Sequence, residues 1–383
     1  MSRLHYIVLL TILSHIAYTG SRVTVSLFAI HLHASAFTVG LLMALYAFFP
    51  ALFSITAGRL TDRIGVRGPM IGGSLLAVLG AFVPFLWNDL GSLYFTSALI
   101  GTGFMVIGVG VYQVVGELST PEQRPTHFSL LSLGFSLGGF TGPMAAGFAI
   151  DNANHAQTFL IFAAFALVPA VALAINPVPL PRPHGHVERP SEAAVLDLLR
   201  NRELRRIYIA VALFSVAWDV FNFAIPLYGS HIGLSASQIG VIMGSFAAAT
   251  FVIRFAVPFI ARRIKPWTLM MISSLIAATS YFLVPFTANV AMLTALLFLL
   301  GLGLGAPQPV VLSLLHDSAP PGRGSEAVGV RILLINASQT VMPLLFGAVG
   351  TALGIMPVFW ATAICLAVGG WLARRRTLAL PES

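Results

Sequence analysis

The sequence predicts an all-α membrane protein whose twelve transmembrane helices form two pseudo-symmetric six-helix bundles. Composition is the first reason, because 57% of the residues are hydrophobic and only 9% are charged, against about 25% charged in a soluble domain. The second is a series of twelve apolar stretches, each close to the roughly 20 residues that cross a bilayer as a helix. The third is an internal repeat at a spacing of 200 residues.

The twelve apolar stretches define the expected helices in chain order. Glycine and proline recur inside them, which transmembrane helices tolerate because neighbouring helices satisfy the freed backbone groups. The stretches lie near residues 5–30, 36–57, 69–87, 91–115, 126–149, 156–175, 206–230, 235–257, 267–286, 290–315, 328–350 and 355–373.

The internal repeat needs no gap. It returns Ser35-Ala36 as Ser235-Ala236, Arg63-Ile64 as Arg263-Ile264, and Pro143 with Gly147 as Pro343 with Gly347. Repeats of this kind are typical of transporters whose substrate site lies at the bilayer midplane, between the repeats. We therefore expect an N-terminal six-helix bundle over 1–175, a cytoplasmic linker with a short amphipathic helix over 176–205, and a C-terminal six-helix bundle over 206–383.

The placement of positive charge predicts the orientation. Most of the 21 Lys and Arg residues lie at the N-terminus, in the connections from even to odd helices, or at the C-terminus. By the positive-inside rule we expect a multi-pass protein of the cytoplasmic (inner) membrane with both termini in the cytoplasm. The net charge of +8 follows from this bias, so we expect contact with the lipid bilayer and no nucleic acid. We expect a monomer.

The sequence lacks the motifs of several other classes of protein. Cys365 is the only cysteine, which excludes an intramolecular disulfide and a thiolate metal site. No phosphate-binding G-x4-G-K-[ST] loop and no His-Glu-x-x-His motif occurs. His184 and His186 alone are too few for a metal site. We therefore expect no enzyme activity, no cofactor and no bound metal.

The connection after the second stretch carries a motif with a defined order of glycines, acid and bases. It reads Gly58-Arg59-Leu60-Thr61-Asp62-Arg63-Ile64-Gly65-Val66-Arg67. It resembles the signature loop of the major facilitator superfamily, and the repeat extends that resemblance over essentially the whole chain. The resemblance implies the major facilitator fold, alternating access between two six-helix halves, and a cytoplasmic gate closed by this loop.

The gate expected from the resemblance also has a physical rationale. Gly58 would permit close helix approach, Gly65 would suit a tight turn, and the Asp62 carboxylate would be favoured beside helix N-termini. A loop that only sets topology remains the alternative, although it explains the arginines and not the acid or the glycines. The expected gate residues are Gly58, Asp62, Arg63, Gly65, Arg67, Arg124 and Arg331.

The fifth stretch carries small residues and a proline in the order Gly138-x3-Gly142-Pro143-x2-Ala146-Gly147. This order resembles the glycine-proline signature of superfamily members that exchange protons for exported solutes. The same spacing also serves plain helix packing. The fourth stretch lacks the arginine that proton-driven drug exporters carry, with Ser97 and Leu99 before its glycines. Export and packing both remain open.

Polar residues form one stripe on the first helix and a matching stripe on the seventh. The first stripe contains His15, Tyr18, Thr19, Arg22 and Ser26, and the second contains Ser215, Trp218, Asp219 and Asn222. Charges at membrane depth cost about 2.5–3.5 kcal/mol and mark functional sites by default. We predict substrate contacts at Arg22, Tyr18, Thr19, Trp218 and Asn222, and reversible protonation at Asp219 or His15. Alternatively Arg22 snorkels to headgroups or pairs permanently with Asp219, and His15 is a packing residue.

Amides and a tyrosine on two other helices complete the expected site. Asn336, Gln339, Tyr112 and Gln113 are predicted substrate contacts. The resulting hypothesis is a secondary active transporter that moves a small organic solute, anionic or amphipathic, by alternating access coupled to protons. The alternatives are a proton-driven multidrug or sugar exporter and, from another class, a non-transporting membrane receptor.

Overall fold

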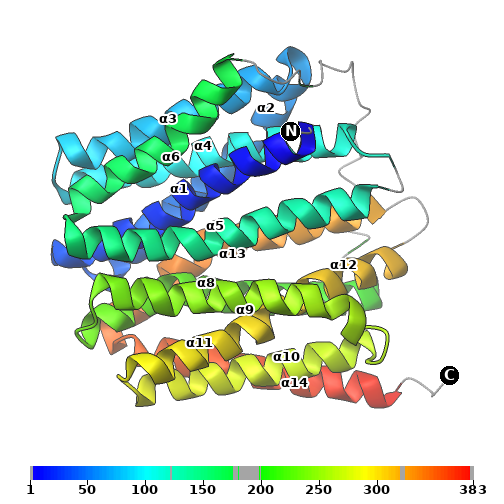
Figure 1. The fold of residues 1–383 in the computed structure, drawn as a ribbon. Helices are drawn as coiled ribbons and strands as arrows, with labels where there is room; N and C mark the ends of the chain where they lie inside the picture. The colour runs from blue at the N-terminus through cyan, green and yellow to red at the C-terminus, as the bar shows by residue number, and fades with distance from the viewer. Residues whose placement is uncertain are drawn as a thin grey trace. The chain divides into compact units, whose positions relative to one another are not determined.

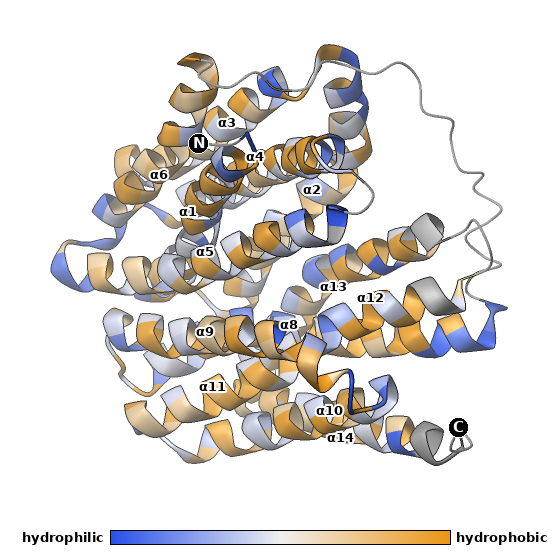
Figure 2. Cartoon of the chain, turned by 45° about the vertical axis from the view of Figure 1, so that its right-hand side comes forward, coloured by the Kyte–Doolittle hydropathy of each residue, from blue (hydrophilic) through white to orange (hydrophobic). Residues whose placement is uncertain are grey.

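The computed structural model describes residues 3–120, 123–175, 180, 198, 200–319 and 324–379. Within these ranges every regular element is a helix, and twelve stretches are long and apolar enough to cross a membrane. Figure 2 shows apolar residues along the middle turns and hydrophilic residues at the helix ends and connections. The all-α, twelve-helix class that the sequence predicts is confirmed.

One compact unit, here unit 1, comprises Met1–Val187 with Pro226–Gly244. Helix α1 packs against α4, α5 and α6, while α4 also packs against α2 and α3 (Figure 1). The Ser35 hydroxyl accepts a hydrogen bond from the Thr38 N–H at 3.2 Å and so caps α2. The first six helices are α1 (Arg3–His31), α2 (Ala36–Ile64), α3 (Arg67–Leu86), α4 (Leu90–Glu117), α5 (Arg124–Asn152) and α6 (His155–Ile175).

The other compact unit, unit 2, comprises Glu188–Ile225 and Ser245–Ser383. Helix α10 packs against both α11 and α14. The Asn201 side chain caps α8, accepting from the Glu203 N–H at 2.9 Å. The remaining elements are α8 (Arg202–His231), α9 (Ala236–Ile260), α10 (Pro266–Leu283), the 3-10 turn η1 (Val284–Phe286), α11 (Val290–Gly305), α12 (Pro307–Ser318), α13 (Gly324–Leu353) and α14 (Met356–Ala379). The end of α8 and the start of α9 belong to unit 1.

The stretch expected as one helix over 290–315 is two helices that meet at Ala306. Proline has no N–H, so Pro307 donates no hydrogen bond to the carbonyl four residues earlier. Proline at the first position of a new helix is, by contrast, well tolerated. The sequence therefore contains the cause of the break, at a point where hydropathy alone sees one continuous span.

The predicted domain limits stay a prediction, since the compact units follow contacts rather than the repeat. Residues 176–179, 181–197 and 199 of the expected linker over 176–205 lie outside the described residues, and with them the start of its short helix and the pair His184 and His186. Leu198 is described and is buried in an apolar cluster of unit 2 with Leu204 and Tyr208, and the last linker residues from Arg202 onward already belong to α8.

Candidate functional site

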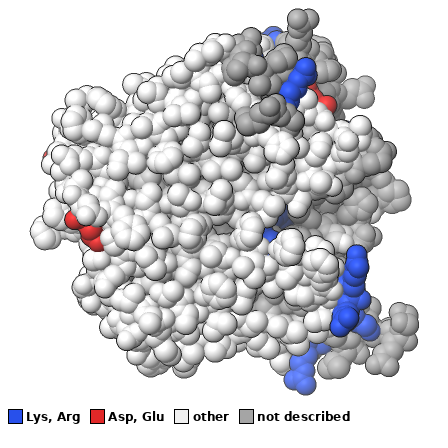
Figure 3. Space-filling view, in the orientation of Figure 1, with Lys and Arg blue, Asp and Glu red and all other residues white. Residues whose placement is uncertain are grey.

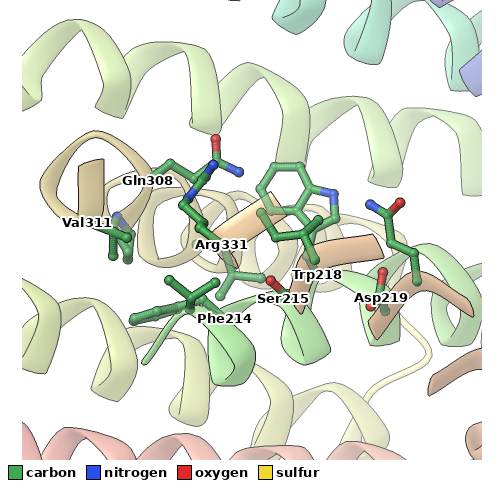
Figure 4. A pocket seen from close by; sticks show the side chains of 12 residues that line it. Phe214, Ser215, Trp218, Asp219, Gln308, Val311 and Arg331 are labelled. Carbon is green, nitrogen blue, oxygen red and sulfur yellow. The ribbon is translucent and has the colours of Figure 1, made fainter. Parts of the chain in front are cut away.

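A cavity in unit 2 contains the buried acid that the sequence singles out. Its empty volume is about 580 Å³, counted to its open mouth. Helix α8 contributes the largest share of its wall, and α11, α12 and α13 complete it. The polar and aromatic residues that line it are Phe214, Ser215, Trp218, Asp219, Gln308, Arg331 and Gln339 (Figure 4).

Asp219 is only 3% exposed and lies in the interior of α8. The Ser338 hydroxyl on α13 donates to its Oδ2 at 2.6 Å. Ser215 precedes Asp219 by one helical turn and shares its face, so α8 presents both to the cavity. A carboxylate at membrane depth is stable only with such polar partners, and groups of this kind mark transport and proton pathways.

Trp218 forms an aromatic wall in the middle of the cavity. Its ring lies edge-on to the Phe246 ring, with 4.9 Å between the ring centroids, and the Phe221 ring stacks on Phe246 with 3.8 Å between centroids. This packing holds the indole in place. Figure 4 shows Asp219 on one side of Trp218 and the side chains of Gln308 and Arg331 on the other. The cavity therefore has one acidic end, one end with amide and guanidinium donors, and an apolar middle.

The basic end of this cavity is built around Gln308, which follows the break between α11 and α12. The Arg254 Nη2 on α9 donates to Gln308 Oε1 at 2.8 Å. Arg331, which is among the residues expected at the cytoplasmic gate, lines the same cavity from α13. A guanidinium is a fixed positive charge with planar donors, so this end suits a carbonyl-rich or anionic group.

Unit 1 holds the second charge at membrane depth, Arg22, against aromatic rings. Its guanidinium carbon lies 5.7 Å from the Tyr18 ring centre and 5.9 Å from that of Tyr46. The Tyr46 hydroxyl donates to Ser21 Oγ at 3.1 Å, which fixes the second ring. Two cation–π contacts stabilise the charge. Tyr46 and Ser21 were not expected from the sequence, because neither lies on the polar stripe of α1.

Two further residues of the α1 stripe, His15 and Thr19, pack against α4 and α5. The His15 ring lies edge-on to that of Phe135 of α5, with 5.1 Å between the ring centroids, and is tilted against that of Phe104 of α4, with 5.5 Å between centroids. The Thr19 hydroxyl donates to the Gly138 carbonyl of α5 at 3.0 Å. A Cβ on Gly138 would stand 2.8 Å from His15 Cβ, so α1 and α5 approach too closely for a side chain there. The glycine order of α5 therefore serves helix packing, whether or not it also serves export.

Comparison with known proteins identifies the family. A model described as Major Facilitator Superfamily matches residues 7–290 and 207–382. The chain belongs to the major facilitator superfamily. The Escherichia coli tetracycline resistance protein of class B is 25% identical over 327 residues, covering 81% of this chain and 78% of that protein. The Streptococcus pneumoniae multi-drug resistance efflux pump PmrA is 24% identical over 346 residues, covering 87% and 84%.

Solved transporters share the fold of this superfamily member. A bacterial homologue of the human lysosomal transporter Spinster, inward-facing and unoccupied, matches with a TM-score of 0.81 at 14% identity over 100% of both chains. A POT family transporter in complex with 5-aminolevulinic acid matches with a TM-score of 0.81 at 16% identity, covering 99% of this chain and 96% of that one. The superfamily member is therefore a multi-pass membrane transporter and not an enzyme, as expected.

The signature loop of this superfamily member includes the C-terminal end of α2 in unit 1, with Gly65 as the residue that caps the helix. Gly65 has a φ of 85°, a left-handed conformation that favours glycine, and its N–H bonds to the Thr61 carbonyl at 2.9 Å. A Cβ on Gly58 would have no described atom within 4 Å, so the close helix approach expected there stays a prediction. Asp62, Arg63 and Arg124 are exposed and Arg67 is half-buried, and their gating role stays a prediction.

Four other expected contacts of the superfamily member lie outside the cavity wall. The Asn222 amide donates to the Trp218 carbonyl of its own helix at 2.9 Å, and Asn336 is half-buried on α13. In unit 1, the exposed Tyr112 ring stacks on Phe128, and the Gln113 amide donates to Glu117 at 3.0 Å. Their role in substrate binding, and the pairing of Arg22 with Asp219, stay predictions.

Unit 1 of the superfamily member also holds a contact between α5 and the start of α9 that the sequence did not reveal. Asp151 Oδ1 accepts from the Ala236 N–H at 3.1 Å, and Oδ2 accepts from the Ser237 N–H at 2.8 Å. A Cβ on Gly240 would stand 2.6 Å from the Pro143 carbonyl, so the two backbones touch. An acid is stabilised beside the first N–H groups of a helix. The sequence did not predict this pair because Asp151 and the start of α9 are about 85 residues apart in the chain.

Proposed function

We propose that the protein exports an amphipathic organic solute across the cytoplasmic membrane by alternating access, and that protons entering the cavity of unit 2 drive the cycle through Asp219. Orientation with both termini in the cytoplasm accompanies this proposal, on the strength of the arginine bias along the sequence. That the protein is a transporter follows from its family. The direction of transport, the class of solute and the coupling to protons are what we propose.

The cavity of unit 2 supports the amphipathic solute. The indole of Trp218, held by Phe246, offers an apolar face, while Gln308, Gln339 and Arg331 offer donors at its margins. An apolar wall with a few convergent polar groups is the usual form of a small-molecule site. Relatives named for tetracycline resistance and multidrug efflux make export the favoured direction.

The observation that carries the proton coupling is the 3% exposure of Asp219 and its bond from Ser338. When Asp219 is ionised, its oxygen accepts a hydrogen bond from the Ser338 hydroxyl; when it is protonated, its own O–H can donate a hydrogen bond. Gain or loss of one proton therefore changes the hydrogen bonding between α8 and α13, two helices that line the cavity. Such a change at a buried group is a direct way for a proton to bias one conformation over another.

Transport by purified protein in liposomes with an imposed pH gradient tests the proposal. The solutes should be tetracycline, a lipophilic cationic dye and an aromatic organic anion. We expect Asp219→Asn to abolish accumulation driven by the gradient while solute-for-solute exchange continues, because exchange needs no net proton movement. Asp219→Glu is the matched control and should retain part of the driven transport.

Ser338→Ala gives a graded test of the same site. It removes the bond to Asp219 and leaves the acid, so we expect a reduction of about 3- to 10-fold in driven transport, which corresponds to roughly 1 kcal/mol. Accumulation that persists in Asp219→Asn at the wild-type level would contradict the proposed coupling.

A second candidate is transport of an organic anion. It is favoured by Arg331 in the cavity wall of unit 2, with Arg254 bonded to the neighbouring Gln308. The three solutes of the liposome assay separate the two candidate functions. Selective transport of the organic anion that is lost in Arg331→Gln would favour the second candidate over amphipathic export.

A further inference from the structure

A groove on unit 2, separate from the Asp219 cavity, runs along the outer side of α8, α10 and α14. Its empty volume is about 980 Å³, counted to its open side. Helix α10 and helix α14 lie side by side along their length (Figure 1), and α8 completes the groove. The residues that define it are Arg206, Leu213 and Phe214 of α8, Trp267 and Ser274 of α10, and Gly369 of α14.

The groove has a polar end and an apolar end at different depths. Arg206 lies in the first turns of α8, and Trp267 lies at the start of α10. Leu213 and Ser274 each follow seven residues later, about 10 Å further along the helix axis. The two helices therefore place their interfacial residues at one level and the deep wall of the groove at another. An arginine and a tryptophan at the rim of an apolar slot match the membrane–water interface.

The deep end of the groove lies where the Leu213 side chain of α8 packs directly over Gly369 of α14. A Cβ on Gly369 would collide with the Leu213 side chain of α8, and one on Gly370 would stand 3.3 Å from Ser274 Cβ. Exposed apolar side chains flank the slot, with Ile209 58% and Leu372 51% exposed. An open apolar slot beside lipid-exposed side chains is a place for an acyl chain rather than for a water-soluble molecule.

The charge around the rim is positive. One nitrogen of Arg206 bonds to Glu203 at 3.2 Å, and that acid is outnumbered by bases on the same and the adjacent helix start. Arg202 and Arg205 are exposed on the first turn of α8, and Arg262, Arg263 and Lys265 are exposed just before α10. Figure 3 shows Lys and Arg gathered at this end of unit 2. A basic rim attracts an anionic phospholipid, whose headgroup has a negative phosphate and no positive group to balance it.

We propose that this groove binds one anionic phospholipid, with an acyl chain along Leu213 and Gly369 and the phosphate at Arg206. Phe214 lines both this groove and the cavity that contains Asp219, so the bound chain packs behind the wall of the transport cavity. The lipid thus becomes part of the packing of α8, the helix that positions Asp219.

Native mass spectrometry of the full-length protein tests the proposal. The protein is held in detergent with equal amounts of phosphatidylglycerol and phosphatidylcholine, and the retained lipids are counted. We expect one retained phosphatidylglycerol, preferred about fivefold over phosphatidylcholine, a ratio that corresponds to about 1 kcal/mol. Arg206→Gln should remove the preference and leave some lipid bound, whereas Gly369→Leu should remove the bound lipid itself.

Matched variants separate the groove from general effects. Arg3→Gln removes an exposed charge from the start of α1 in unit 1, and Gly72→Leu adds the same side chain to an open position on α3, so both should behave as wild type. If Gly369→Leu does not fold, Ala210→Phe narrows the groove from its half-buried wall and should have the same effect. Equal retention of the two lipids by wild type, or retention by Gly369→Leu and Ala210→Phe at the wild-type level, would overturn the proposal.

Discussion

The contact between Asp151 and the start of α9 leads to a quantitative prediction about local stability in unit 1. The first amides of a helix have no partner within the helix. In α9, the Ala236 and Ser237 N–H groups bond to Asp151, and the Gln238 N–H bonds to Ser235 Oγ at 3.2 Å. Asp151→Ala therefore leaves two of these three amides without a protein partner.

The expected cost follows from known capping energies. Loss of a side-chain cap costs about 1 kcal/mol, and loss of a negative charge at a helix N-terminus costs about 0.3–1 kcal/mol more. A total of about 1.3–2 kcal/mol corresponds to a factor of about 10–30 in the opening equilibrium of this turn. Asp151→Asn retains one oxygen acceptor and loses the charge, so it should fall between wild type and Asp151→Ala.

Hydrogen–deuterium exchange followed by mass spectrometry measures this opening directly. We expect peptides covering the first turns of α9 to exchange about 10–30 times faster in Asp151→Ala. Asp89→Ala is the matched control, because Asp89 caps its own helix α4 through the Gly91 N–H at 3.0 Å. That variant should leave the α9 peptides unchanged. Unaltered exchange of α9 in Asp151→Ala, or equal acceleration in both variants, would refute the reasoning.

Two further predictions concern the packing of α1 in unit 1. Gly138→Ala should destabilise the protein by about 1–3 kcal/mol, seen as a lower apparent Tm in detergent, because the new methyl group meets His15 Cβ at 2.8 Å. Gly72→Ala, at an open helical position, should instead raise stability by up to about 1 kcal/mol, and an equal loss in both would count against the close-packing explanation. Arg22→Gln removes the contacts with Tyr18 and Tyr46 and should cost about 0.5–2 kcal/mol in the same assay, with Arg22→Lys retaining part of the stability. An unchanged Tm in Arg22→Gln would show that these ring contacts contribute nothing.

The helices could be predicted because their signals are local. Apolar length defines each span, and the hydroxyl of Ser35 or the amide of Asn201 stands directly before the helix that it caps. The repeat and the signature loop then pointed to the family without knowledge of any contact. The break at Ala306 was readable in principle from Pro307, but a hydropathy average hides a single missing N–H group.

The contacts of the candidate site could be predicted only in part. The sequence identified Asp219 and Trp218 as lining residues, because polar groups in an apolar helix stand out. Its partner Ser338 lies 119 residues away and resembles any other small residue on α13. Arg331 was expected at the gate because it lies near a helix end, and its place in the cavity wall depends on packing that the sequence does not show. Which helix faces meet is decided by packing, and no local pattern records it.

The interruption at Ala306 leaves one transmembrane segment of unit 2 a backbone hydrogen bond short, because Pro307 has no N–H. Proline is a common cause of a bend inside a helix, and Ala306 itself keeps helical backbone angles. Helix α12 starts with Pro307 and Gln308, both of which line the cavity, while a Cβ on Gly305 would collide with Ile253 of α9. A change in the bend at Ala306 would therefore move Gln308 and alter the polar end of the cavity, while the close contact at Gly305 keeps the end of α11 beside α9.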